Sequence, residues 1–321
     1  MRLESDSFPK GIFLSPYDVA RPVNWREQFG NAHPLHLEIG FGLGEFLIRR
    51  AEFSPRENFI GLEQDWPRIY KCMQKVSALR RLVGNAAFGE NLRILRIDAV
   101  VAFQRLFAPR GLDTVTCLFP CPWPKKDHVK YRLFSRDFFC LLNSRMKDGA
   151  GVRIVTDWQP YFDWMKDELG DSGFAARTAV VPPQFGTKFE RKWREGGQEK
   201  FWELQLTKLQ HRDVPVEEDC ELKVYFLKDF DPGHFRFENV TGDVSVILKD
   251  FIFDPRQNTG LARLIVAEKF LTQHVWAVIV KRQDHWCVAK ADGHSALPTK
   301  GVALALEQVY QAARKSVEVK E

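Results

Sequence analysis

The sequence contains no long hydrophobic run. All of its apolar stretches fall short of the roughly 20 residues that a helix needs to span a bilayer. The first residues, Met1 to Asp6, contain no apolar core of the kind that a secretory signal carries. We therefore expect a protein with no membrane partner, located in the cytoplasm.

Cysteine is scarce, and the six cysteines do not cluster. No two of them form a C-x-x-C pair, so neither a disulfide framework nor a zinc site is indicated. The histidines of the C-terminal third, His274, His285 and His294, share no ligand spacing. The sequence therefore predicts no metal site.

The sequence also lacks a strong excess of charge of either sign, with a net charge of only +5. With 45% hydrophobic and 28% charged residues, the composition is that of a soluble globular protein. The charge is unevenly distributed: residues 1–208 hold 32 basic and 25 acidic residues, and residues 209–321 hold 15 and 17. An anionic partner is therefore expected to bind the first part.

The most informative stretch lies at residues 37–45 and reads Leu-Glu-Ile-Gly-Phe-Gly-Leu-Gly-Glu. It predicts a strand, a glycine-rich turn and the start of a helix. A dinucleotide fingerprint counted from Gly40 and Gly42 requires a third glycine where this chain has Glu45. Together with Glu38, that carboxylate would repel a pyrophosphate and suit a positively charged ligand such as S-adenosylmethionine. The alternative is an ordinary tight strand-to-helix turn.

From residue 35 onward, short β-like runs alternate with amphipathic segments. Such alternation predicts βαβ units and a parallel sheet covered on both faces, with ligands at the carboxyl ends of the strands. The predicted strands are 35–39, 58–63, 92–98, 114–120 and 152–157, and the predicted helices are 44–53, 66–83, 99–107, 133–147 and 159–169.

Carboxylates stand at the ends of the second and third predicted strands. Glu63 is well placed to accept both hydroxyls of a ribose, although it could also be a plain surface carboxylate. Asp98 could accept from an adenine amino group or could only cap the next helix. With the glycine turn, these residues describe an adenosine pocket.

The fourth predicted strand leads into a segment, residues 119–132, with three prolines followed by basic and aromatic side chains. A rigid turn followed by such residues suits an RNA backbone with a splayed base, and the alternative is a solvated basic loop. Further on, Glu190 could accept from the donor edge of guanine. It could instead pair with Lys188 or Arg191 in a β-hairpin, before an edge strand at residues 201–206.

With these motifs, the chain from about Trp25 to Lys208 resembles the bacterial tRNA (guanine-N7)-methyltransferase family. The resemblance implies a Rossmann-like class I S-adenosylmethionine-dependent methyltransferase fold. It also implies methylation of guanine N7 at nucleotide 46, in the variable loop of tRNA. The motifs are Glu38 to Gly42, Ile60 to Glu63, Asp98-Ala99, Phe119 to Lys126, Thr156 to Trp158 and Thr187 to Arg191.

The resemblance also implies roles for individual residues. The residues implied to bind S-adenosylmethionine are Glu38, Gly40, Gly42, Gly44, Glu63, Asp98 and position 121. Those implied to bind the guanosine are Lys125, Asp157, Thr187, Lys188, Phe189 and Glu190. Those implied to contact the rest of the RNA are Lys126, Lys130, Arg132 and Arg191.

One departure stands inside the proline motif. The family has an aspartate there, assigned to cofactor binding and catalysis, and this chain has Cys121. A rival hypothesis is therefore a non-catalytic tRNA-binding protein that keeps the cofactor pocket. A small-molecule methyltransferase would leave the basic and guanine-reading segments without a purpose.

The sequence predicts three parts. Residues 1–34, with four prolines, form an irregular arm on the first domain, residues 35–208 form the methyltransferase domain, and residues 209–321 form a smaller α+β domain. In the last part, β-like runs at 221–230, 244–253, 261–270, 274–281 and 286–289 precede a C-terminal helix. The sequence implies neither a role for this domain nor an oligomeric state.

Overall fold

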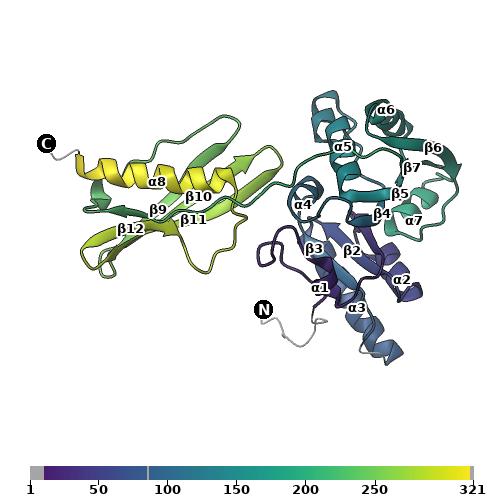
Figure 1. Cartoon of the computed structure of the whole chain (residues 1–321), viewed down its shortest axis with the longest axis horizontal. Helices are drawn as coiled ribbons and strands as arrows, with labels where there is room; N and C mark the ends of the chain where they lie inside the picture. Colours follow the sequence, from purple (N-terminus) through teal and green to yellow (C-terminus); the bar gives the residue numbers. More distant parts are fainter. Residues whose placement is uncertain (1–10, 85–86, 319–321) are drawn as a thin grey trace. The chain divides into compact units, whose positions relative to one another are not determined.

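The structure is a computed structural model that describes residues 11–84 and 87–318. The chain forms two compact units, which meet in sequence between Glu217 and Glu218. Each unit has its own sheet and its own hydrophobic core. Figure 1 colours the first unit from purple to green and the second from green to yellow.

The first unit alternates strands and helices, as the sequence pattern predicts. Its elements are α1 (Trp25–Phe29), β1 (Leu35–Ile39), α2 (Glu45–Phe53), β2 (Asn58–Glu63), α3 (Trp66–Val83), β3 (Leu92–Arg96), α4 (Ala99–Arg105), β4 (Leu112–Leu118), η1 (Lys126–Tyr131), α5 (Arg136–Arg145), β5 (Met146–Thr156), α6 (Gln159–Leu169), β6 (Phe174–Val181), α7 (Lys188–Glu195) and β7 (Phe201–Lys208).

The seven strands form one sheet in the order β3-β2-β1-β4-β5-β7-β6. The first five strands in that order are parallel to one another. Every residue of β1 and β2 is buried, which requires cover on both faces of the sheet. The predicted α/β fold with a largely parallel sheet is confirmed.

The carboxyl-terminal part of this unit differs from the prediction. The strand predicted at the sheet edge, β7, lies inside the sheet and is antiparallel to both β5 and β6. The edge is β6, which the sequence does not predict because most of its side chains are exposed and show no apolar alternation. The segment around Glu190 is the helix α7 and not a hairpin, and Thr187 caps its first turn.

The described part of the N-terminal arm, residues 11–34, begins alongside β3. The Ile94 amide donates to the Ile12 carbonyl at 2.8 Å, and the Leu14 amide donates to the Ile94 carbonyl at 2.9 Å. Ile12 is buried, and the Phe13 ring makes an edge contact with Trp66. The irregular arm therefore rests on the first unit, with α1 as a short helix; residues 1–10 lie outside the described residues.

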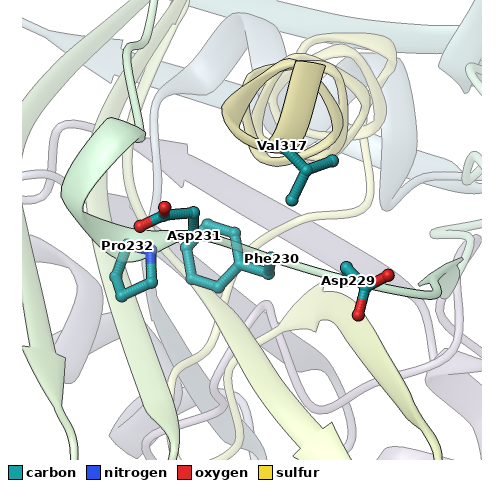
Figure 2. Close-up of a pocket in the computed structure, with 5 residues that line it drawn as sticks. All are labelled: Asp229, Phe230, Asp231, Pro232 and Val317. Carbon is teal, nitrogen blue, oxygen red and sulfur yellow. The ribbon is translucent and has the colours of Figure 1, made fainter. Parts of the chain in front are cut away.

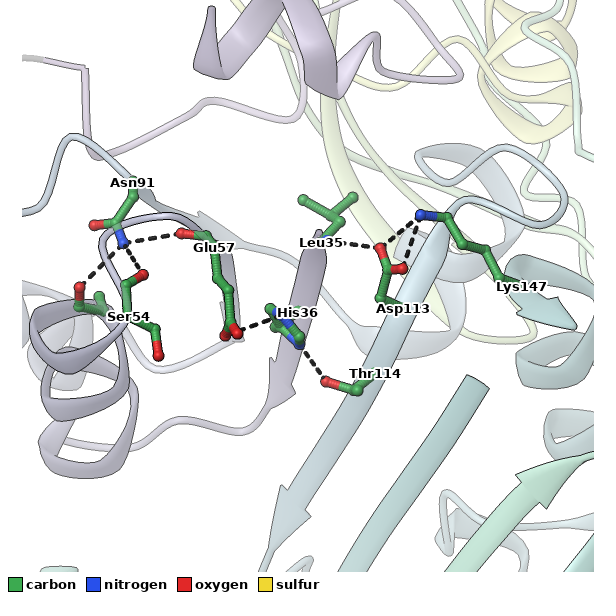
Figure 3. A network of polar contacts seen from close by, with 9 residues as sticks. Leu35, His36, Ser54, Glu57, Asn91, Asp113, Thr114 and Lys147 are labelled. Carbon is green, nitrogen blue, oxygen red and sulfur yellow. Dashed lines mark hydrogen bonds and ion pairs between the residues drawn. The ribbon is translucent and has the colours of Figure 1, made fainter. Parts of the chain in front are cut away.

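His36 ties the amino-terminal ends of β1 and β4 together (Figure 3). Its Nδ1 lies 2.6 Å from the Thr114 hydroxyl, and its Nε2 lies 3.1 Å from the Glu57 carboxylate. Beside it, the Leu35 amide donates to Asp113 at 2.8 Å. Burial lowers the pKa of the His36 imidazole, followed in effect by the positive charge of Arg50. Because this network lies at the end of β1 away from the glycine turn, we assign it to holding the sheet.

The second unit is an antiparallel sheet in the order β8-β12-β11-β10-β9, with a helix packed on one face. The apolar side of this helix, including Val302, Leu306 and Val309, is fully buried against Leu264 and Val275 of the sheet. The predicted α+β unit is confirmed. Its elements are β8 (Tyr225–Leu227), η2 (Pro232–His234), β9 (Ser245–Asp254), β10 (Thr259–Glu268), β11 (Leu271–Arg282), β12 (His285–Lys290) and α8 (Lys300–Glu318).

A hollow lies beside the last turn of α8, next to η2 (Figure 2). The carboxylate of Asp231 faces it but serves the turn: one oxygen accepts from the Gly233 amide at 2.9 Å, and the other lies 3.0 Å from His234 Nδ1. We therefore assign no ligand to this hollow. No helix in the described part of the chain combines the length and apolarity needed to cross a membrane.

Residues 210–217, which we call the strap, follow β7 and are held against the first unit. The fully buried guanidinium of Arg145 donates to the carbonyls of Val214 at 2.6 Å and Pro215 at 2.9 Å. The Glu217 amide donates to the Gln104 carbonyl at 2.9 Å. The sequence places the domain boundary at 208/209, and the units divide at 217/218, because a buried guanidinium requires the acceptors that the strap provides.

Candidate active site

The glycine turn between β1 and α2 leaves open space at the carboxyl end of β1. Its three glycines have φ values of +70° at Gly40, +58° at Gly42 and +76° at Gly44. A Cβ on Gly40 or Gly42 would meet no atom within 4 Å, whereas a Cβ on Gly44 would lie 2.4 Å from Cys72 Sγ. The first two glycines therefore leave room for a ligand, and the third allows close packing against α3.

Glu38 lies on β1 and is only 5% exposed. Its Oε2 has no hydrogen-bond partner among the described residues. Burial raises the pKa of this carboxyl to about 8, against the smaller opposing effect of the Arg50 charge. A buried carboxylate without a partner is costly unless a cation reaches it. Glu38 therefore fits a ligand that brings positive charge.

Glu63, at the end of β2, joins that strand to the glycine turn. Its carboxylate accepts from the amides of Gly42 at 3.1 Å, Gln64 at 2.9 Å and Asp65 at 3.0 Å. It is 7% exposed, so the alternative of a plain surface carboxylate is wrong. Since each carboxylate oxygen can accept more than one hydrogen bond, these contacts are compatible with a ribose.

Asp98 caps α4, which is one of the two roles predicted for it; the other is to accept from an adenine amino group. Its Oδ1 accepts from the amides of Val100 at 2.8 Å and Val101 at 3.4 Å. Its Oδ2 accepts from the Gln64 side-chain amide at 2.7 Å. Burial raises the pKa of this carboxyl. Gln64 thus bridges the ends of β2 and β3, a contact that no sequence signal distinguishes from an ordinary surface glutamine.

The proline segment leaves β4 through unusual backbone conformations. Phe119 has a φ of +57° and Trp123 a φ of +43°. The thiol of Cys121 is exposed, and so is the side chain of Lys125. Because β4 pairs in parallel with β1, the segment starts beside the glycine turn. The position of the missing aspartate therefore lies at the carboxyl edge of the sheet, where ligands bind in folds of this class.

Arg132 is directed into the protein, unlike its exposed neighbours on η1. Its guanidinium carbon lies 5.5, 5.3 and 5.0 Å from the ring centres of Trp158, Tyr161 and Trp164. Its Nε donates to the Pro122 carbonyl at 2.9 Å. The resemblance implies an RNA contact for this arginine, but these contacts hold the proline segment against α6. By comparison, Lys126 and Lys130 are exposed.

The carboxylate of Glu190 organises the loop before α7. It accepts from the backbone amides of all three residues at 184–186 and is 4% exposed. The alternative ion pair with Lys188 or Arg191 in a hairpin is wrong, because the segment is helical and Arg191 pairs instead with Glu45 at 3.3 Å.

The remaining predicted substrate residues surround that loop and the end of β5. Thr187 accepts from the Glu190 amide at 3.2 Å, while Lys188 and Phe189 are exposed. Asp157 follows β5 and is half-buried, and burial raises the pKa of its carboxyl.

An ion-pair bridge connects α7 to the glycine turn. Glu45 Oε1 lies 3.3 Å from Arg191 and 3.2 Å from Lys75, and Lys75 also donates to the Leu43 carbonyl at 2.9 Å. From α2, Arg49 donates to the Phe185 carbonyl. The structure therefore brings the predicted cofactor turn and the predicted guanosine segment side by side.

Metal ligands do not gather in this site. Within residues 11–84 and 87–318, no three His, Cys, Asp or Glu side chains lie together as a metal ion would require. All of the predicted site residues belong to the first unit.

Known proteins match the same region. Residues 32–203, more than half of the chain, match a family described as "Putative methyltransferase". The chain is 39% identical over 200 residues to a tRNA (guanine-N(7)-)-methyltransferase of Chlorobium phaeobacteroides, covering 62% of this chain and 92% of that protein. It is 37% identical over 204 residues to one from Paraburkholderia xenovorans, covering 61% and 74%.

Among solved structures, an antibiotic-related methyltransferase is similar at 18% identity and a TM-score of 0.44, over 58% of this chain and 92% of that one. The family match at residues 32–203 includes all of the motifs named in the sequence analysis. The chain belongs to this methyltransferase family, together with the tRNA (guanine-N(7)-)-methyltransferases that it matches.

Proposed function

We propose that this chain transfers the methyl group of S-adenosylmethionine to N7 of a guanine in tRNA, which forms 7-methylguanosine. The observation that carries the proposal is the bridge through Glu45, which joins the glycine turn to α7. The two relatives named above carry this activity in their names. We propose further that the methylated guanine is nucleotide 46, in the variable loop, and that the protein acts in the cytoplasm, where tRNA is used.

The residues present fit the cofactor. Glu38 offers a buried carboxylate oxygen without a partner to a ligand that carries positive charge, and Gly40 and Gly42 leave space beside it. Glu63 and Asp98 stand at the ends of the next two strands, where a ribose and an adenine would lie. When bound, S-adenosylmethionine supplies an electrophilic methyl group on a sulfonium.

The chemistry asks the protein mainly for alignment. Guanine N7 has a lone pair and no proton, so its methylation needs no general base. Oriented approach of this kind supplies about 7–11 kcal/mol of a barrier. We propose that Lys125, Asp157 and the 187–190 segment hold the guanosine, with Glu190 acting by fixing the loop at 184–186.

Exposed cations beside this site would hold the tRNA backbone. Lys126 and Lys130 on η1 are exposed, as phosphate contacts require. Arg191 is exposed too, although it also pairs with Glu45.

Mass spectrometry of tRNA incubated with the protein and isotope-labelled S-adenosylmethionine tests the proposal. We expect labelled 7-methylguanosine in tRNA from a strain that lacks the modification. If neither the wild-type chain nor Cys121→Asp labels that tRNA while both bind it, the protein is the non-catalytic tRNA binder.

A further inference from the structure

The sheet of the second unit has an outer face, on the side opposite α8. Along β10 and β11, side chains alternate between buried residues that face the helix and partly exposed residues that face away from it. Figure 1 shows α8 running along one side of this sheet. Large apolar side chains on the outer face include Phe226, Ile252, Leu261, Ile265, Trp276, Val278 and Val280.

These side chains form a continuous apolar stripe across the sheet. Leu261 on β10 pairs with Ile252 on β9 and with Val278 on β11. Val280, next on the same face of β11, pairs with Cys287 on β12, which pairs with Phe226 on β8. Ile252 and Phe226, on the two edge strands, are 60% and 61% exposed. Such a stripe is typical of an interaction surface.

The charges on this face balance one another. Arg263 and Asp250 are direct cross-strand partners, and Arg263 Nε donates to Asp250 Oδ2 at 2.6 Å. Residues 209–321 as a whole carry 15 basic and 17 acidic residues. A nucleic-acid surface requires an excess of positive charge, which this region lacks. A face without net charge can instead pack against an identical face without repulsion.

The area of the outer face is also large enough for an interface with an identical face of a second copy. The five strands lie about 4.8 Å apart and are 3 to 12 residues long, so at ~3.4 Å per residue the face spans between roughly 600 and 700 Å². Two such faces would bury about 1,200 Å² in total, which reaches the lower end of the range for specific interfaces. Sheets pack face to face in this way at a separation of about 10 Å.

We propose that the outer face of this sheet is the docking surface for a second copy of the chain. The contact is isologous, so that the stripe of one copy covers the stripe of the other. It makes the protein a dimer through its second unit. This inference is independent of the proposed methyltransferase function.

Sedimentation and light scattering of the full-length chain test the proposal over a wide range of concentrations. We expect twice the mass of one chain. Val278→Asp, in the middle of the stripe, and Ile252→Arg, at an exposed position, should each raise the dimer dissociation constant by more than about tenfold. Ser295→Asp is the matched control: it adds the same charge to an exposed position between β12 and α8, off the sheet, and the dimer should persist.

A wild-type chain that stays monomeric at every concentration overturns the proposal, and so does a dimer that survives both substitutions. A monomer whose tRNA affinity falls in Val278→Asp and rises in Ile252→Arg would mean that the face binds RNA instead. Circular dichroism confirms that each variant is folded. If Val278→Asp fails to fold, Ile252→Arg decides, because its side chain is exposed in the single chain.

Discussion

At the scale of single residues, Cys121 is the clearest departure from the family. Its thiol is exposed beside the glycine turn, and a thiol is a weak hydrogen-bond partner. We expect Cys121→Asp to raise the methylation rate, by up to the order of 10²–10³ that a positioned electrostatic group supplies. Cys121→Ala should change the rate little. Single-turnover rates with saturating cofactor measure both effects.

The opposite pattern would give the cysteine a chemical role of its own. In that case Cys121→Ala abolishes methylation, and Cys121→Asp does not restore it. Cofactor affinity, measured separately, shows whether either variant has damaged the pocket.

Arg132 is expected to act on the proline segment and not on RNA. A lysine keeps the charge but loses the planar group that lies over three rings and donates to Pro122. Arg132→Lys should therefore lower kcat roughly tenfold or more, which corresponds to at least about 1.4 kcal/mol, with little change in KM for tRNA. Lys130→Ala is the control. Removing this exposed lysine should reduce the slope of log affinity against log salt concentration for tRNA binding by roughly one unit.

If Arg132→Lys reduces the salt dependence of tRNA binding and leaves kcat unchanged, Arg132 contacts a phosphate of the tRNA instead. The difference in tryptophan fluorescence between the wild type and Arg132→Lys reports on Trp158 and Trp164, the two tryptophans that lie against this guanidinium.

Glu38 should make both stability and cofactor binding depend on pH. Its pKa rises from 4.5 to about 8 on folding, so its contribution to stability is complete below about pH 4.5 and is lost as the pH rises through about 8. A positively charged ligand favours the ionised form. The affinity for S-adenosylmethionine should therefore increase up to about pH 8, and binding at pH 7 should release a proton.

Calorimetry in two buffers with different ionisation enthalpies measures that proton. Glu38→Gln serves as the control, since the amide cannot titrate and the remaining pH dependence then belongs to the ligand. Equal proton release by the variant and the wild type would remove Glu38 from the pocket.

Sequence reasoning identifies candidate site residues more readily than their contacts. A carboxylate near a strand end is visible in the sequence, so Glu38, Glu63 and Asp98 could be named as candidates for cofactor binding. Gln64 and Lys75 could not, because their contacts depend on how distant helices and strand ends meet. Their side-chain types at those positions are typical of any solvated surface.

At the scale of elements, the loop before α7 depends on one carboxylate. Glu190→Gln replaces an oxygen with a donor that faces backbone N–H groups, so at least one of them loses its acceptor. We expect a loss of about 1–3 kcal/mol in the free energy of unfolding, together with a higher KM for tRNA. Binding of S-adenosylhomocysteine should be unchanged. Urea denaturation and steady-state kinetics measure these effects.

Unchanged stability with a complete loss of guanine selectivity would show that Glu190 reads the base directly. A matched control is Glu195→Gln at the end of the same helix, where the side chain is exposed.

Elements with strong apolar periodicity could be predicted almost to the residue. The helices α3 and α6 begin and end where the sequence places them, and so do β1 and β2. Elements whose position depends on tertiary contacts could not. The strand β6 is mostly exposed, and α7 is so polar that only its Thr187 cap marks its start. The order of β7 and β6 in the sheet has no local signal in either strand.

At the scale of the whole molecule, the strap decides where the first unit ends. A chain that ends at Glu217 should fold and bind tRNA, because the basic surface lies in this unit. A chain that ends at Lys208 leaves the buried Arg145 without its acceptors at Val214 and Pro215. We expect the shorter chain to be less stable by about 3 kcal/mol, as measured by urea denaturation.

Equal stability of the two chains would mean that water replaces the strap around Arg145. Failure of the chain that ends at Glu217 to bind tRNA, although folded, would transfer RNA binding to the second unit.

The strap also determines how mechanical force enters the first unit. Without it, a pull on residue 218 would reach the end of β7 and could open the sheet one hydrogen bond at a time. With it, the pull reaches the Glu217 amide bond to Gln104 first, and then the two carbonyls held by Arg145. The load is therefore taken up by α4 and α5. Thermal motion of the second unit therefore loads these two helices before it can disturb β7, the strand that pairs with β5.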